Sequence, residues 1–219
     1  PTPPSSVGNP FDNTKYDYLI NPHLTNELKK LTTAAAKKDL NQAAAFWIDS
    51  IAAIQTRSAA DGGTLKDYLD SAASNGGNKP LTAVFIVYDL PGRDCAAAAS
   101  NGELICNSET SQADCDKALT KYKKDYIGAL VTLLGNYPQL NLVAVIEPDS
   151  LPNAATNMDK ANCQKAVPYY KKGIEYAIQQ LSTLPNITMY LDAAHGGWLG
   201  FSDNLTKYSD VACEVLSNS

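Results

Sequence analysis

The sequence predicts an α/β protein whose parallel strands form the first portion of a β/α barrel. Four apolar runs have the length of buried strands, and helical patterns separate them along the chain, which is the order expected of βα units. Acidic side chains follow each run, as they do at the C-terminal edge of the sheet in α/β enzymes. The alternation stops at Ser219 after about half of the units that a complete barrel needs. A small open α/β sheet is the alternative.

The expected strands and helices follow one another along most of the chain. Residues 9–22 are expected to be irregular, and Thr25 is the expected N-cap of a helix that continues to about Leu40. Apolar residues spaced every three or four positions predict the later helices. The expected strands are residues 43–49, 84–88, 142–149 and 187–192, and the later helices are residues 65–73, 119–134, 167–181 and a last one from Ser202 or Asn204 toward Leu216.

The composition is that of an ordinary globular protein with an acidic balance. Of the 219 residues, 44% are hydrophobic, and 18 Lys and Arg stand against 23 Asp and Glu, which gives a formal net charge of −5. Nucleic acids and anionic membranes bind basic patches, so this charge argues against both partners. No apolar run approaches the length that crosses a bilayer. We therefore expect a sizeable core and no nucleic-acid or membrane partner.

The first residues, the cysteines and two sequons together favour a secreted, extracellular protein. Residues 1–8 resemble the end of a flexible Pro/Thr/Ser linker, which implies another module upstream. The five cysteines form no CxxC pair, which argues against zinc and favours disulfides. Cys106 and Cys115 are close enough in sequence for a disulfide that closes, or clips, the loop between them. Asn186 and Asn204 begin N-x-T sequons and are the expected glycosylation sites.

Three stretches at the ends of the expected strands have a combined pattern that is highly specific. They are residues 88–103 (YDLPGRDCAAAASNGE), 145–151 (VIEPDSL) and 190–200 (YLDAAHGGWLG). In this order and at this spacing they resemble the signatures of glycoside hydrolase family 6, which contains cellobiohydrolases and endoglucanases. The resemblance implies a distorted β/α barrel with fewer than eight strands, and residues 9–219 are expected to be the N-terminal part of its catalytic domain.

The resemblance also implies an activity. The family hydrolyses β-1,4-glucosidic bonds of cellulose and cello-oligosaccharides with inversion, and we expect release of cellobiose from non-reducing ends. No cofactor and no metal is expected. The protein is expected to be a monomer, tethered through residues 1–8 to a cellulose-binding or docking module.

The chemistry of glycoside cleavage fits the carboxylates in these stretches. Cleavage needs a protonated acid beside the leaving oxygen and a water molecule on the opposite face of the sugar. Asp149 resembles the family's general acid, and Asp94 resembles the aspartate that keeps this acid protonated. Tyr88 is similar to the tyrosine that presses on the reacting sugar, and Ser100 to the serine that holds the water.

Aromatic side chains near the strand ends are similar to the family's sugar-binding platforms. Trp47 with Asp49 resembles the platform and polar contact on the non-reducing side of the scissile bond. On the leaving-group side the resemblance implies a platform and two neighbouring polar groups, with a further substrate contact from the loop before Glu103. These residues are Trp198, His195, Asp192 and Asn101.

The resemblance further implies a disulfide between Cys95 and Cys163, which leaves Cys106–Cys115 as an extra clip and Cys213 unpaired. Two positions depart from the family's pattern. Gly92 stands where Asp or Asn is usual, and Ala194 replaces the usual Gly.

Several alternatives remain open at this point. Asp89 and Glu147 are explained as well by structural pairing with Arg93 or a lysine as by a catalytic role. Four strand-end carboxylates could instead hold a divalent metal ion. The activity could be that of an endoglucanase with an open cleft, or the chain could be a non-catalytic module that binds cello-oligosaccharides.

Overall fold

The computed structural model describes residues 8–31, 43–74, 77–97 and 99–219. Its parallel sheet has five strands within these residues, namely β1 (Asp17–Tyr18), β2 (Phe46–Ile48), β3 (Leu81–Val87), β4 (Asn141–Ile146) and β5 (Ile187–Leu191). β1 and β2 lie along the same side of β3, where Asp17 is level with Leu81 and Ile48 with Val87. β4 and β5 follow on the other side. The prediction of a parallel α/β fold is confirmed.

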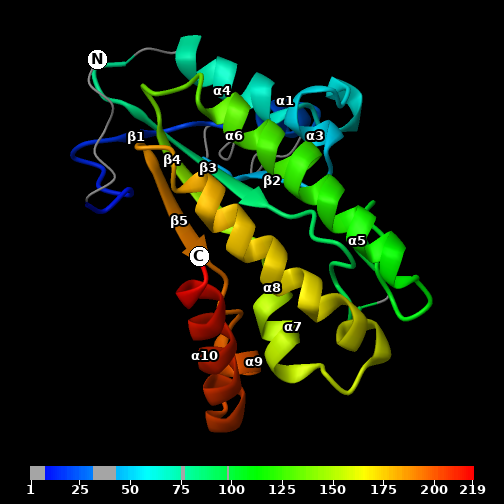
Figure 1. Cartoon of the computed structure of the whole chain (residues 1–219). Helices are drawn as coiled ribbons and strands as arrows, with labels where there is room; N and C mark the ends of the chain where they lie inside the picture. The colour runs from blue at the N-terminus through cyan, green and yellow to red at the C-terminus, as the bar shows by residue number, and fades with distance from the viewer. Residues whose placement is uncertain (1–7, 32–42, 75–76, 98) are drawn as a thin grey trace.

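Helices cover the sheet and connect its strands (Figure 1). Figure 1 shows the green helices α5 and α6 and the yellow helix α8 running across one face, with α9 and α10 beyond the end of β5. The helical elements of the described residues are α1 (Pro22–Lys29), α3 (Ala52–Gln55), a 3₁₀ turn (Ala59–Asp61), α4 (Leu65–Ser74), α5 (Gln112–Lys121), a π-helical segment (Tyr122–Ile127), α6 (Gly128–Leu134), α7 (Ser150–Thr156), α8 (Ala161–Leu181), α9 (Gly196–Leu199) and α10 (Ser202–Ser217). None of these helices combines the length and apolar character needed to cross a membrane.

The core lies between the sheet and its helices. Phe85 of β3 and Leu142 of β4 are fully buried, as are Tyr126, Leu130 and Ile174 from the helical layer. Tyr126 and Leu130 are four residues apart, the spacing from which the apolar pattern predicted a helix here. The core thereby fixes the strand ends, where the polar stretches begin.

The first fifty residues differ from their prediction. Residues 9–22 were expected to be irregular but contain β1, which is too short to show a periodic pattern. The first helix begins at Pro22 rather than after Thr25, because the Asn21 side chain accepts hydrogen bonds from the N–H groups of His23 and Leu24. The helix also ends at Lys29, so the expected single helix to about Leu40 is wrong. Residues 32–42 and the expected linker, apart from Gly8, lie outside the described residues.

The expected helix over residues 119–134 is longer and less regular than predicted. It begins at Gln112, where Ser111 caps it by accepting a hydrogen bond from the Asp114 N–H. Its middle is the π-helical segment, in which Tyr122 and Tyr126 are both fully buried. Such π-bulges inside α-helices are frequent at functional sites. The strand expected over residues 43–49 is also shorter, since only Phe46–Ile48 pairs with β3.

The structure argues against a glycan at Asn186. This side chain is 3% exposed, and its amide donates to the carbonyl oxygens of Tyr137 (3.0 Å) and Leu140 (2.8 Å). Both amide hydrogens are therefore occupied, and a sugar on this nitrogen would break the contacts that fix the turns before β4. Asn204, the other sequon, lies in the first turn of α10 and is partly exposed.

A substitution at Asn186 tests its structural role. Asn186→Ala is expected to lower the free energy of unfolding by about 1–3 kcal/mol, since two buried carbonyls lose their donors. Urea unfolding would measure the change. Asn136→Ala is the matched control, because the exposed Asn136 amide donates to a single carbonyl, that of Thr132. Equal effects of the two substitutions, or loss of a glycan from the Asn186 variant, would contradict this assignment.

Candidate functional site

The carboxylates that the sequence placed after the strands lie at one edge of the sheet. Asp49 follows β2, Asp89 follows β3, Glu147 follows β4 and Asp192 follows β5. Because all pairings are parallel, the carboxyl ends of the strands meet along this edge. The sheet order therefore gathers residues 88–103, 145–151 and 190–200 into one site.

Asp149 lies at the centre of this edge, immediately before α7. Its backbone N–H donates to Oδ2 of Asp192 at 2.9 Å, which ties the end of β4 to the end of β5. Burial raises the pKa of the Asp149 carboxyl, and the negative charges of Asp192 and Asp94 raise it further, while His195 opposes them. This carboxyl therefore keeps its proton to higher pH than an exposed aspartate does.

Tyr88 and Asp94 form a second pair beside Asp149. The Tyr88 hydroxyl donates to Oδ2 of Asp94 at 2.6 Å. The Arg93 guanidinium stacks 4.5 Å from the centre of the Tyr88 ring and donates to the carbonyl oxygens of Asp49 (2.7 Å) and Ser100 (2.8 Å). Burial, followed by the hydrogen bond to Asp94, raises the pKa of Tyr88, so the phenol stays neutral. Arg93 thus holds the tyrosine and the loop in one arrangement.

Backbone strain is concentrated in the same loops. Five non-glycine residues among those described have a positive φ, and they belong to the three stretches noted in the sequence: Asp94 (55°), Ser100 (65°), Glu147 (46°), Asp149 (65°) and Ala194 (48°). Each such residue costs of order 1–3 kcal/mol and persists only where its surroundings hold it. Clustered strain of this kind is typical of active sites.

A buried layer of polar groups lies beneath these residues. Glu147 is 1% exposed and accepts hydrogen bonds from the Tyr122 hydroxyl (2.8 Å) and from the N–H groups of Asp89 (3.1 Å) and Leu90 (3.3 Å). The Tyr126 hydroxyl accepts from the Tyr88 N–H at 2.9 Å and donates to the Ile48 carbonyl. The π-helical segment thus ties the ends of β2, β3 and β4 together.

The carboxyl group of Asp89 is the least satisfied group in this layer. It is fully buried, and no hydrogen-bond donor within the described part of the chain reaches either of its oxygens. Nη1 of Arg93 lies 3.8 Å from Oδ1. Burial raises the pKa of Asp89 to about 9, with further contributions from the charges of Glu147 and Glu103. Asp89 is therefore protonated at neutral pH, and Arg93 lies too far from it for a hydrogen bond.

Sequence reasoning did not single out Tyr122 or Tyr126. They appeared only as members of an apolar helical face, and nothing in a 3.6-residue pattern marks a π-bulge. The one available signal was chemical, because a buried tyrosine hydroxyl needs a hydrogen-bond partner. Two tyrosines four residues apart on a buried face therefore indicate a polar partner inside the core.

The two tryptophans lie toward opposite ends of the site. Trp47 is on β2, is 50% exposed, and meets the Tyr88 ring edge-on at 5.2 Å. Trp198 is on α9, beyond β5, and its indole N–H donates to Oγ1 of Thr156 at 2.8 Å. The exposed His195 ring lies 6.4 Å from the Trp198 ring. Since β2 and β5 flank β3 and β4, Tyr88 and Asp149 lie between the two indoles.

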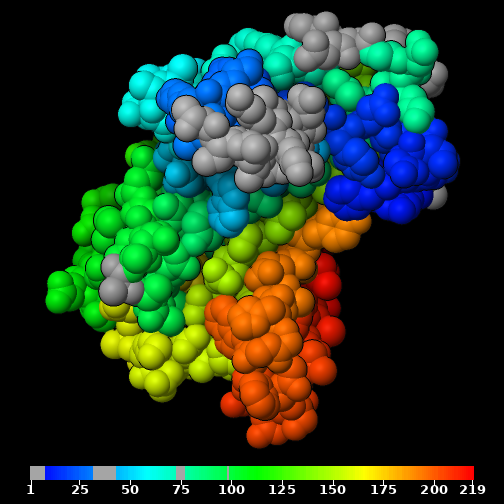
Figure 2. All heavy atoms as spheres, turned by 180° about the vertical axis from the view of Figure 1, so that it is seen from behind, coloured from blue at the N-terminus to red at the C-terminus, as the bar shows by residue number. Residues whose placement is uncertain are grey.

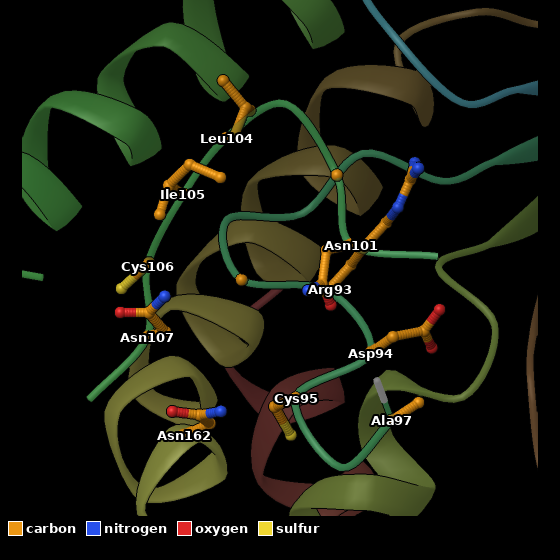
Figure 3. Close-up of a pocket in the computed structure, with 12 residues that line it drawn as sticks. Arg93, Asp94, Cys95, Ala97, Asn101, Leu104, Ile105, Cys106, Asn107 and Asn162 are labelled. Carbon is orange, nitrogen blue, oxygen red and sulfur yellow. The ribbon is translucent and has the colours of Figure 1, made fainter. Parts of the chain in front are cut away.

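The loop after β3 is held by both predicted disulfides. Cys95 is bonded to Cys163 of α8, and Cys106 to Cys115 of α5, while Cys213 is free and exposed. These pairings are confirmed. A small pocket of about 60 Å³ opens between the two arms of this loop and the start of α8. Figure 3 shows Asn101 beside Arg93 on one side of the pocket, with Asn107 and Asn162 on the other.

The packing around position 92 explains why it is glycine rather than the Asp or Asn that is usual in the family. Its φ is +71°, and its N–H donates to the Leu104 carbonyl at 2.8 Å. A Cβ added here would lie 2.1 Å from the carbonyl oxygen of Cys106. The clipped loop therefore packs directly on a position where no side chain fits.

A substitution of this glycine tests that packing. Gly92→Ala is expected to lower stability by about 2–4 kcal/mol, from a steric clash of about 1–3 kcal/mol and the left-handed backbone conformation. Thermal unfolding would measure the loss. Gly63→Ala is the matched control, because Gly63 also has a positive φ (+68°) but has no atom within 4 Å of an added Cβ. Equal losses for the two variants would mean that the loop is not packed on Gly92.

No group of three or more His, Cys, Asp or Glu side chains in the described ranges is arranged to hold a metal ion. Three of the four strand-end carboxylates, those of Asp49, Glu147 and Asp192, instead accept hydrogen bonds from protein groups. Asp49 accepts a hydrogen bond from Arg57 at 2.6 Å, and Asp192 accepts from the N–H groups of Asp149 and Ala194.

Comparison with known proteins identifies the family. The model of glycosyl hydrolases family 6 matches residues 8–219. The chain belongs to this family. Exoglucanase A of Cellulomonas fimi is 41% identical over 182 residues, which are 81% of this chain and 20% of that protein. A probable 1,4-beta-D-glucan cellobiohydrolase C of Aspergillus clavatus is 38% identical over 223 residues, or 98% of this chain and 44% of that protein.

Solved family 6 structures share the fold. The catalytic domain of Cellulomonas fimi Cel6B superposes with a TM-score of 0.85 at 36% identity, over 97% of this chain and 48% of that domain. The α/β fold described above is therefore that of a portion of a family 6 catalytic domain. The chain spans about half the length of that domain and less than half of the two relatives above.

Proposed function

We propose that this protein acts, within a family 6 catalytic domain, in the hydrolysis of β-1,4-glucosidic bonds of cellulose with inversion of configuration. The observation that carries the proposal is that two groups lie next to each other between the indoles of Trp47, which is half exposed, and Trp198, which is partly buried. One is Asp149, a carboxyl whose pKa is raised. The other is the hydrogen-bonded pair of Tyr88 and Asp94.

In this mechanism Asp149 donates a proton to the glycosidic oxygen as the bond to the leaving sugar breaks. A general acid must be protonated in the free enzyme and must lose its proton readily in the transition state. Burial and the nearby charges of Asp192 and Asp94 supply the first condition. The Asp192 carboxylate also fixes the backbone of Asp149 through its hydrogen bond.

The positive charge that develops on the sugar requires a negative partner. Asp94 supplies this charge and lies in the loop that Arg93 anchors. Tyr88, held between Asp94 and the Arg93 guanidinium, presses on the reacting ring. Ser100, held in a strained backbone conformation in the same loop, orients the water molecule that attacks from the opposite face.

Glucan binding extends from one tryptophan to the other. Sugar rings have apolar faces that stack on aromatic side chains, so Trp47 and Trp198 serve as platforms on the two sides of the scissile bond. Asp49, Asp192, His195 and Asn101 provide the polar contacts to hydroxyl groups. The half-exposed face of Trp47 supports this role, because a purely structural indole would be covered.

We infer that the mode of action is release of cellobiose from non-reducing ends. The clipped loop between Cys106 and Cys115 packs on Gly92 beside the site, as a loop that roofs a tunnel would. The relatives named exoglucanase and cellobiohydrolase support the same mode. We also propose that the protein is secreted, is a monomer and carries a glycan at Asn204.

The stereochemistry of the product tests the proposed function. Proton NMR of cellotetraose incubated with the protein should show α-cellobiose first, which then mutarotates. Initial formation of the β-anomer would contradict inversion, and binding without any released sugar would favour a non-catalytic binding module. A rapid fall in the viscosity of carboxymethyl-cellulose would replace the exo mode with an endoglucanase mode.

A further inference from the structure

Trp198 is held in place through both its side chain and its backbone. Its indole N–H donates to Oγ1 of Thr156 at 2.8 Å, and its carbonyl oxygen accepts from the Asn204 side-chain amide at 2.8 Å. Figures 1 and 2 both show the orange helix α9, which carries Trp198, beside the yellow-green helix α7, which ends at Thr156. The proposed function uses the Trp198 ring as a platform but gives no role to Thr156.

The hydroxyl group of Thr156 is oriented to accept from the indole. A hydroxyl has one hydrogen to donate, whereas an indole N–H can only donate. Thr156 donates its hydrogen to the Pro152 carbonyl at 2.9 Å, which leaves lone pairs of Oγ1 for the indole. The Asn157 amide donates to the same Oγ1 at 3.3 Å and to Oδ1 of Asn153 at 2.8 Å. The acceptor is therefore fixed within the protein before any substrate binds.

Helix α7 joins this acceptor to the proposed general acid. Asp149 immediately precedes the helix, Thr156 is its last residue, and residues 150–155 between them are all buried. The Asp149 N–H donates to Oδ2 of Asp192, whose carbonyl oxygen accepts from the Tyr208 hydroxyl of α10 at 2.8 Å. A short helix that is packed on its neighbours keeps its two ends at a constant separation. The contact with Thr156 therefore sets where the indole lies relative to Asp149.

We propose that Thr156 is a positioning residue, which fixes the Trp198 indole relative to Asp149 and so determines how well the protein recognises sugar residues on the leaving-group side. Thr156 acts through the indole rather than on the sugar itself. A binding group that is displaced from its productive position loses catalytic efficiency, even when it is far from the bond that breaks. The inference rests on the proposed function, since it assumes that Trp198 carries a leaving-group sugar.

NMR of the intact protein tests the contact without any substrate. The sequence contains two tryptophans, so the indole N–H signals of Trp47 and Trp198 report separately in a proton–nitrogen correlation spectrum. Thr156→Val keeps the branched shape of the side chain but removes the acceptor. It should shift the Trp198 signal and speed its exchange with solvent, while the Trp47 signal stays unchanged and shows that the variant folds. Thr156→Ser should restore the original signal, and Trp198→Phe assigns it.

Two substrates show whether the contact serves the leaving-group side. Cellotetraose places sugar residues on both sides of the scissile bond, whereas a dinitrophenyl cellobioside has none on the leaving-group side. Thr156→Val should lower kcat/KM for cellotetraose by about three- to tenfold, as loss of one hydrogen bond does, and leave turnover of the cellobioside unchanged. Thr156→Ser should recover the activity on cellotetraose.

Thr132→Val is the matched control. The exposed Thr132 hydroxyl also donates to the carbonyl four residues earlier, that of Gly128 at 2.8 Å, but no indole within the described residues donates to it. This variant should therefore leave both indole signals and both substrates unaffected.

The outcomes separate this inference from the proposed function. An unchanged Trp198 signal in Thr156→Val, or equal losses on the two substrates, would overturn the positioning role and leave the proposed function intact. If the unsubstituted protein cleaves neither substrate, the proposed function is wrong, and the role of Thr156 in recognition is wrong with it.

Discussion

Replacement of Asp149 by asparagine is expected to lower kcat on unactivated cello-oligosaccharides by about 10²–10⁴-fold, the usual contribution of a general acid. The amide cannot donate a proton to the leaving oxygen, but it keeps the shape of the carboxyl. Binding of cello-oligosaccharides should therefore change little. Steady-state kinetics and calorimetric titration of the same variant would measure the two effects.

The leaving group and the pH profile make this prediction specific. A cellobioside with a dinitrophenolate leaving group needs no protonation, so the variant should recover most of its activity on that substrate. In the unsubstituted protein, the proposed activity should fall as pH rises through the raised pKa of Asp149. This alkaline limb should be absent from the variant. Asp159→Asn, at an exposed carboxylate between α7 and α8, is the control. Near-normal turnover in Asp149→Asn would exclude Asp149 as the acid.

Replacement of Asp89 by asparagine is expected to make stability much less dependent on pH. The folded protein holds a proton on Asp89 up to a pH of about 9, whereas the unfolded chain releases it near the ordinary aspartate value. The native state therefore binds more protons than the unfolded state between these values, and stability falls as pH rises through this window. Below the unfolded pKa both states are protonated, so the full stability is present there.

Asparagine keeps the shape of the protonated carboxyl and has no proton to lose. The melting temperature of Asp89→Asn should therefore exceed that of the unsubstituted protein by a margin that grows from about pH 5 to about pH 8. Thermal unfolding across this range would measure the margin. Asp125→Asn, at an exposed residue of the π-helical segment, should leave the slope unchanged. A constant difference at all pH values would mean that Asp89 is not a protonated group in the folded state.

Much of the fold was predictable because its signals are local. The apolar runs of β3, β4 and β5 lie within a few residues of their predicted positions, since buried parallel strands are continuous hydrophobic segments. β1 was not predicted, because a strand of two residues is too short to show an alternating pattern of apolar and polar side chains. The start of α1 was misplaced because the Asn21 cap lies before the apolar pattern begins.

The sequence was enough to predict which residues belong to the candidate site, but not which residues they contact. The three stretches named Tyr88, Asp94 and Asp149, yet no spacing rule shows that Asp192 accepts a hydrogen bond from the Asp149 backbone. That contact joins residues 43 positions apart. The same limit applies to Asn186, which has the local pattern of a glycan acceptor but is buried by the turns before β4.

The sequence by itself determined the order of βα units, the carboxylate after each strand and the motifs that place the chain in its family. These are properties of neighbouring residues, which periodicity and motif chemistry report directly. Only the tertiary structure decided which carboxyls are buried and how the tyrosines of the π-helical segment tie three strands together. Those features depend on desolvation and on contacts between distant segments, and the folded sheet creates both.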